Sequence, residues 1–144
     1  MNPGASLQSY RQISLETAPP GELVRMLYDG AIRFLGLARI GFESEDPLER
    51  NLAVHNNVTK AQDILNELVV TLDMDLGGKL AETLRDLYLY MGDRLQESNI
   101  NKAPAGIDEV TERLTEIRDA WCQMLANQAN GQHDSISGFV EAVG

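Results

Sequence analysis

Four long segments in which apolar residues recur every three or four positions dominate this chain, and strand signals are nearly absent. The run Val69-Val70-Thr71 is the only short β-branched stretch, and it lies inside a helical pattern. Such spacing is typical of helices that bury a face against neighbours. The sequence therefore predicts an all-α fold, an antiparallel up-down four-helix bundle with a short N-terminal segment packed on it.

The predicted helices cover roughly residues 19–42, 46–72, 79–101 and 107–127. Asp46 and Pro47 are a favourable start for the second helix, because the carboxylate can cap the backbone and proline fits the first turn. Gly77-Gly78 is interpreted as the stop of that helix. Pro104 and Gly106 are expected to break the chain before the fourth helix.

The segments outside the bundle differ from it in composition. Residues 19–127 are predicted to form the bundle domain, and residues 1–18 are a short, mixed and weakly helical N-terminal segment. Residues 128–144 are rich in Gly, Ser, Asn and Gln, so they are predicted to be a flexible tail.

Charge and composition exclude several classes of protein. The chain has 144 residues and a formal net charge of −10, which argues against nucleic-acid binding and against binding to an anionic membrane. No stretch approaches the ~20 apolar residues of a transmembrane helix. The first ten residues lack the basic start and apolar run of a secretory signal. We therefore expect a cytosolic protein without membrane insertion.

Reactive chemistry is not indicated either. His55 and His133 have no cysteine or carboxylate cluster at metal-ligand spacing, and no glycine-rich loop follows a strand. The single cysteine, Cys122, cannot form an internal disulfide and is expected to be a buried, inert thiol beside Trp121. The sequence predicts no enzyme activity, no catalytic residue, no metal, no cofactor and no small-molecule substrate.

One alternative depends on His55. Four-helix phosphotransfer modules carry one exposed histidine, typically in a His-x-x-Lys-Gly pattern. In this chain the lysine after His55 is Lys60, and no glycine follows it. The spacing disfavours a histidine phosphotransfer module, which stays an alternative, as does a structural bundle that self-associates.

The first and third predicted helices carry more apolar surface than one bundle face requires. Tyr28, Ile32, Leu35, Leu89 and Tyr90 cannot all point into one core if each helix buries a single stripe. Either neighbouring elements cover this surplus, or it forms a groove for an amphipathic segment of a partner. The fourth helix differs, because its apolar residues form one stripe that includes Trp121.

Several motifs in this order resemble the family of flagellin-specific export chaperones, the FliS family. The motifs are Ser9-Tyr10-Arg11-Gln12-Ile13, Met26-Leu27-Tyr28-Asp29-Gly30-Ala31-Ile32, Asn57, Lys60-Ala61-Gln62-Asp63-Ile64-Leu65, Glu67-Leu68, Leu72-Asp73, Gly77-Gly78, Leu87-Tyr88, Tyr90-Met91, Arg94-Leu95, Asn99 and Trp121. The resemblance spans about residues 9–125. Each piece is weak alone, and their order and spacing together are specific.

The resemblance implies a chaperone that binds the C-terminal segment of flagellin in the cytosol, prevents premature polymerisation and assists type III export at the flagellar export gate. It implies no nucleotide and no metal. The residues expected to contact flagellin are Leu27, Tyr28, Ile32, Ile64, Leu68, Tyr90 and Leu95. In the family the N-terminal segment can lie over part of this surface, so Tyr10 and Ile13 are expected to be lid residues.

Overall fold

The computed structural model describes residues 20–130, which form four α-helices and no strand. The helices are α2 (Pro20–Gly41), α3 (Pro47–Thr71), α4 (Gly78–Asn101) and α5 (Ala105–Ala129). The all-α prediction is confirmed, and the bounds agree with the sequence pattern to within about two residues. Thr17, Tyr10, Ile13 and residues 131–144 lie outside the described residues.

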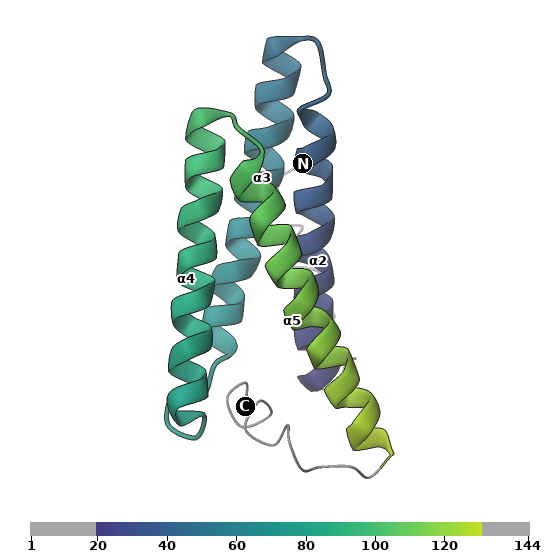
Figure 1. Cartoon of the computed structure of the whole chain (residues 1–144), viewed down its shortest axis with the longest axis vertical. Helices are drawn as coiled ribbons and strands as arrows, with labels where there is room; N and C mark the ends of the chain where they lie inside the picture. The colour runs from purple at the N-terminus through teal and green to yellow at the C-terminus, as the bar shows by residue number, and fades with distance from the viewer. Residues whose placement is uncertain (1–19, 131–144) are drawn as a thin grey trace.

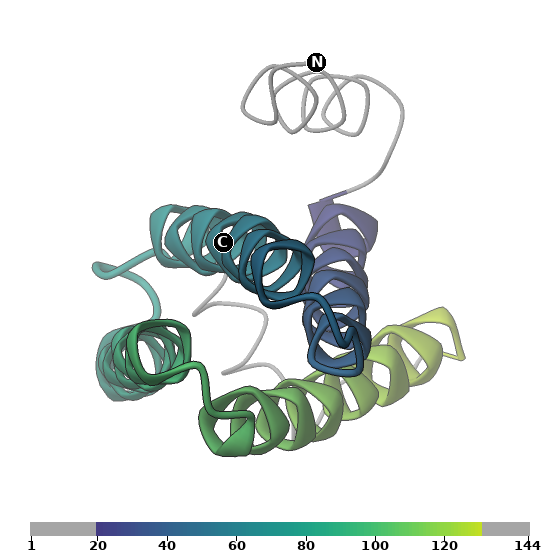
Figure 2. The ribbon, with the colours of Figure 1, turned by 90° about the horizontal axis from the view of Figure 1, so that it is seen from above.

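Consecutive helices run in opposite directions, and α5 returns to pack against α2, so that the four helices form a closed ring (Figures 1 and 2). Short links enforce this up-down order, because a helix of about 25 residues spans nearly 40 Å and its successor must turn back at once. Each helix therefore contacts two neighbours and buries two flanks.

The start of α3 follows the predicted capping chemistry. A side-chain oxygen of Asp46 accepts a hydrogen bond from the backbone N–H of Leu48 at 3.0 Å, and Pro47 occupies the first turn. This contact satisfies one of the N–H groups that have no partner inside the helix. The N-terminal end of α3 was thus predictable from local sequence alone.

The interpretation of the glycines was wrong in two places. α3 ends at Thr71 with Leu72 extended, whereas Gly78 has a φ of +52° and begins α4. Gly106 lies inside the first turn of α5, where a Cβ atom would be 2.5 Å from the carbonyl oxygen of Arg94. Glycine is needed there because two helices approach closely, and the left-handed residue of this link is Lys102, with a φ of 46°.

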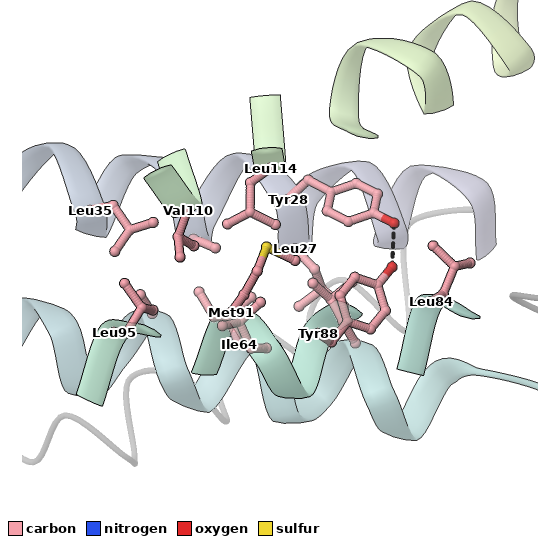
Figure 3. Close-up of a cluster of buried hydrophobic side chains, with 14 of the residues drawn as sticks. Leu27, Tyr28, Leu35, Ile64, Leu84, Tyr88, Met91, Leu95, Val110 and Leu114 are labelled. Carbon is pink, nitrogen blue, oxygen red and sulfur yellow. Dashed lines mark hydrogen bonds between the residues drawn. The ribbon is translucent and has the colours of Figure 1, made fainter. Parts of the chain in front are cut away.

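The core runs along the bundle axis and draws on all four helices (Figure 3). Its largest fully buried side chains include Tyr28, Tyr88, Leu35, Met91 and Leu114. Among residues 20–130, no helix is long and apolar enough to cross a bilayer.

Candidate partner-binding surface

The seven residues expected to contact a partner divide into a buried and an accessible group. Five are core residues with at most 3% of their surface exposed: Leu27, Tyr28, Ile64, Leu68 and Leu95. Ile32 is half-buried and packs on the core, and Tyr90 is 43% exposed. In this conformation only Ile32 and Tyr90 can be reached from outside, so a contact role for the other five stays a prediction and requires helices to move.

Ile64 illustrates why the pattern was hard to interpret. It lies off the main apolar ladder of α3, yet it is 2% exposed, because α2 packs on that flank. Its Cδ1 atom would lie 3.2 Å from a Cβ atom placed on Gly30. A helix with two neighbours thus needs additional apolar residues, because these pack against the second neighbour.

The sequence pattern indicated five apolar residues in the first and third helices that could not all point into one core. Two of them, Tyr28 and Leu35, are fully buried. Leu89 and Tyr90 are 50% and 43% exposed on α4. The extra apolar residues are therefore exposed on α4, whereas most of those on α2 are buried by neighbouring helices. An exposed aliphatic residue beside an exposed tyrosine is a reachable apolar surface on α4.

Two further groups of exposed apolar residues gather at the ends of the bundle, and the sequence pattern did not single them out. One flanks the α2–α3 turn and consists of Leu37, Ile40, Leu48 and Leu52; the other flanks the α3–α4 turn and consists of Val70, Met74, Leu76 and Leu80. On α3 the signal was present, since Leu52 and Val70 lie opposite the ladder that runs from Val54 to Leu68.

A pair of tyrosines places two hydroxyl groups inside the apolar core. The hydroxyl oxygens of Tyr28 and Tyr88 lie 2.5 Å apart and share a hydrogen bond between α2 and α4 (Figure 3). Burial raises the pKa of Tyr88 to about 12, and burial together with the neighbouring Tyr88 raises the pKa of Tyr28 further. Both tyrosine side chains therefore stay neutral, and each hydroxyl group provides the hydrogen-bond partner that the other lacks in the apolar core.

Polar contacts between α4 and α5 gather around Glu109. Its carboxylate accepts hydrogen bonds from the Tyr90 hydroxyl at 2.7 Å, from Arg94 at 2.8 Å and from Arg113 at 2.9 Å. These donors, Tyr90 first, hold the pKa of Glu109 down at about 2. The Arg113 guanidinium also lies 5.7 Å from the centre of the Tyr90 ring. Tyr90 is thus held in place although it is exposed.

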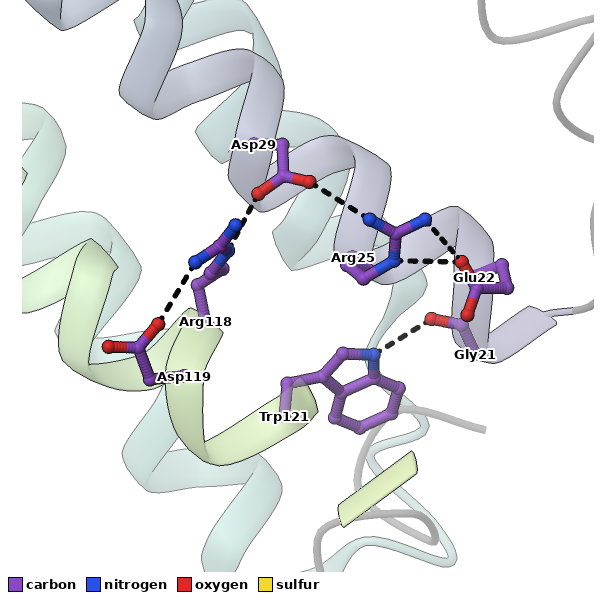
Figure 4. A network of polar contacts seen from close by, with 7 residues as sticks. All are labelled: Gly21, Glu22, Arg25, Asp29, Arg118, Asp119 and Trp121. Carbon is purple, nitrogen blue, oxygen red and sulfur yellow. Dashed lines mark hydrogen bonds and ion pairs between the residues drawn. The ribbon is translucent and has the colours of Figure 1, made fainter. Parts of the chain in front are cut away.

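A second polar cluster joins α2 to α5 (Figure 4). Asp29 accepts from Arg118 at 2.8 Å and pairs with Arg25 at 3.3 Å. Next to it the indole N–H of Trp121 donates to the backbone carbonyl of Gly21 at 2.8 Å. The prediction that Trp121 is a core residue is confirmed, since it is 2% exposed.

The two remaining candidates for a reactive side chain are His55 and Cys122. His55 is exposed, and its Nδ1 atom lies 3.0 Å from the side-chain nitrogen of Asn99. Cys122 is half-buried, so the expectation of a buried thiol was wrong. Within residues 20–130 no group of three or more His, Cys, Asp or Glu side chains is placed to hold a metal ion.

These features define a small antiparallel helical bundle, and its distinctive feature is the apolar surface that its helices expose. Comparison with known proteins makes the assignment specific. The family model described as "Flagellar protein FliS" matches residues 3–128, so the chain belongs to the FliS family.

Three curated relatives carry related names. The "Flagellar secretion chaperone FliS" of Bacillus subtilis is 36% identical over 127 residues, which is 88% of this chain and 91% of that protein. The protein of the same name from Salmonella typhimurium is 35% identical, over 86% of this chain and 93% of the relative. "Flagellar secretion chaperone FliSB" of Pseudomonas aeruginosa is 33% identical, over 81% and 92%. These matches favour a chaperone over a phosphotransfer module or a purely structural bundle.

Proposed function

We propose that this protein is a flagellar secretion chaperone that binds the C-terminal segment of flagellin in the cytosol and keeps it from polymerising before export. The observation that carries the proposal is membership of the FliS family over nearly the whole bundle. The exposed apolar residues of α4 support it, because apolar patches on soluble proteins usually mark binding sites.

The proposed binding mode is an amphipathic segment laid against apolar helix surfaces. Tyr90 and Ile32 are the members of the predicted set that a partner reaches first. Leu27, Tyr28, Ile64, Leu68 and Leu95 join the contact only if the helices separate. Delivery to the flagellar export gate is part of the same proposal and rests on the family alone. The chaperone is proposed to act without catalysis, metal or cofactor.

The decisive experiment is co-purification with flagellin, either complete or lacking its C-terminal segment. We expect the complete flagellin to bind and the truncated one not to bind. Calorimetry should show a negative heat-capacity change, because folding of a segment on binding buries about 1,000–3,000 Å². If both flagellins bind equally, the binding segment lies elsewhere in flagellin. If neither binds, the proposed function is wrong.

Tyr90 provides the variant that tests the surface. Tyr90→Asp removes the exposed ring and should weaken flagellin binding by at least about 2 kcal/mol if the site is a hot spot. Tyr90→Phe keeps the ring and loses only the bond to Glu109, so it is the matched control and should bind nearly normally. Ile64→Asp is unsuitable for this purpose, because a charge at that buried position disrupts the core.

A further inference from the structure

Arg33 and Lys60 differ from the other cations of the bundle. Within residues 20–130, every other lysine or arginine side chain has a carboxylate, amide or backbone oxygen as its acceptor. Arg33 and Lys60 have no such acceptor in this part of the chain, although the sequence has 22 acidic residues and only 12 basic ones. A lone solvated cation would be ordinary, whereas these two lie together.

Both cations lie against one aromatic ring, that of Phe34. The Arg33 guanidinium is 5.0 Å from the ring centre, and the Lys60 ammonium is 5.3 Å from it. Arg33 and Phe34 belong to α2 and Lys60 belongs to α3, so the arrangement joins two helices that run side by side (Figure 2). Phe34 is half-buried and packs on the core, which holds the ring in place. The ring thus keeps two positive charges within about 10 Å, the screening length of 0.1 M salt.

Leu37 adds apolar surface beside the two cations. It lies four residues after Arg33 and three after Phe34, so the three side chains share one flank of α2. Leu37 is 41% exposed, and Arg33 is exposed as well. Positive charges next to exposed apolar surface are complementary to a segment that carries acidic and apolar residues on the same face.

The acidic side chains nearest in sequence do not neutralise the two cations. Asp29, one turn before Arg33, is bound by Arg118 at 2.8 Å. Asp63, three residues after Lys60, forms no ion pair within the described helices. Burial raises the pKa of Asp63, as expected for a carboxyl group without a cationic partner. The described helices therefore leave both cations available to carboxylates of another molecule.

We propose that Arg33 and Lys60 receive carboxylates of flagellin's C-terminal segment, while Phe34 and Leu37 contact apolar side chains next to those carboxylates. The inference rests on the proposed function, which supplies the occupant, and it adds a contact surface on α2 and α3. Because the chain has a net charge of −10, an acidic stretch is repelled over most of the surface and attracted here. The cation pair thus fixes the register of the segment along the helices.

The test measures flagellin binding by calorimetry with the complete chain, at low salt and at about 0.5 M salt, where exposed charge contacts are strongly screened. Arg33→Gln combined with Lys60→Gln should weaken binding about tenfold at low salt, and the difference should nearly vanish at high salt. Lys79→Gln combined with Arg85→Gln is the matched control, because it removes the same charge from two cations of α4 that pair with carboxylates of their own helix. The control should bind nearly normally, and circular dichroism verifies that both variants stay folded.

A charge swap identifies the group on the partner. Each acidic residue of flagellin's C-terminal segment is changed in turn to lysine. The residue that docks at Lys60 should lose affinity for the unaltered chain and regain it with Lys60→Glu, because the swap restores an ion pair of opposite orientation.

The outcomes separate this inference from the proposed function. If the unaltered chain does not bind flagellin, the proposed function is wrong, and the contact inferred here is wrong with it. If the unaltered chain binds, and the variant without the Arg33 and Lys60 charges binds equally well at both salt concentrations, this inference alone is wrong and the two cations are only solvated. An equal loss in the Lys79 and Arg85 control would show that net charge matters and a local site does not.

Discussion

The α2–α3 interface and the α4–α5 interface solve the same packing problem differently. α2 and α3 approach closely along their length, since a Cβ atom on Gly41 would lie 2.9 Å from that of Ala53 and Ile64 packs against Gly30. α4 and α5 are held at one end by Glu109 and its partners and part at the other. Small residues bring helices together over long stretches, whereas a cluster of charges at one end leaves the other end free to separate. One bundle thus contains a pair of helices that pack closely along their length and a pair that diverges toward one end.

The comparison is tested most strongly at the diverging end, where Trp121 of α5 packs against α2. Trp121→Ala should cost roughly 3–5 kcal/mol, because it removes a buried indole and its hydrogen bond to Gly21. Chemical denaturation should show a lower midpoint. The exposed neighbour Gln123→Ala is the control and should change stability by less than about 0.5 kcal/mol. A loss below about 1 kcal/mol for Trp121→Ala would contradict the view that this residue anchors α5.

Glycine substitutions compare the two interfaces at their closest points. Gly106→Ala should cost about 1–3 kcal/mol, since the new Cβ atom meets the Arg94 carbonyl and the Ser98 hydroxyl at 2.5 Å. Gly41→Ala should cost less, because its nearest contact is a methyl group at 2.9 Å. Gly36→Ala has open space and should stabilise α2 by about 0.5–1 kcal/mol. Thermal unfolding of the three variants gives the order, and equal losses at Gly106 and Gly36 would refute the close approach.

The tyrosine pair tests the link between α2 and α4. Tyr28→Phe leaves the Tyr88 hydroxyl buried without its partner and should cost about 1–3 kcal/mol. The double variant with Tyr88→Phe removes both polar atoms, so its loss should be smaller than the sum of the single losses. Urea denaturation of the four proteins in the cycle measures the coupling. Strict additivity would mean that the two hydroxyl groups do not depend on each other.

The smallest expected effect is the pH dependence contributed by Glu109. Its pKa in the folded protein is about 2, below that of a free glutamate, because Tyr90, Arg94 and Arg113 favour the ionised form. Its stabilising contribution is therefore complete above the unfolded pKa of about 4.3 and is lost as the pH falls toward 2. Glu109→Gln should flatten the stability profile in that window, whereas Glu112→Gln, an exposed neighbour, serves as the control. Profiles that coincide for the wild type and Glu109→Gln would show that the cluster contributes nothing.

The sequence alone determined the order and approximate bounds of the four helices within residues 20–130. Asp46, Pro47 and the apolar ladder from Val54 to Leu68 act locally, so each could be recognised without knowing the neighbours. The core position of Trp121 was equally clear, because α5 carries a single stripe. The family resemblance could also be recognised, since it rests on the order of short motifs.

Only the tertiary structure decided which apolar residues stay accessible. Leu27, Tyr28 and Ile64 could not be told by pattern from Tyr90, yet packing buries these three and leaves Tyr90 43% exposed. The role of Gly106 was hidden for the same reason, because its need for space arises from α4 and not from its own backbone angles. Periodicity states how much surface a helix must bury, whereas the crossing and divergence of its neighbours determine where that surface is covered.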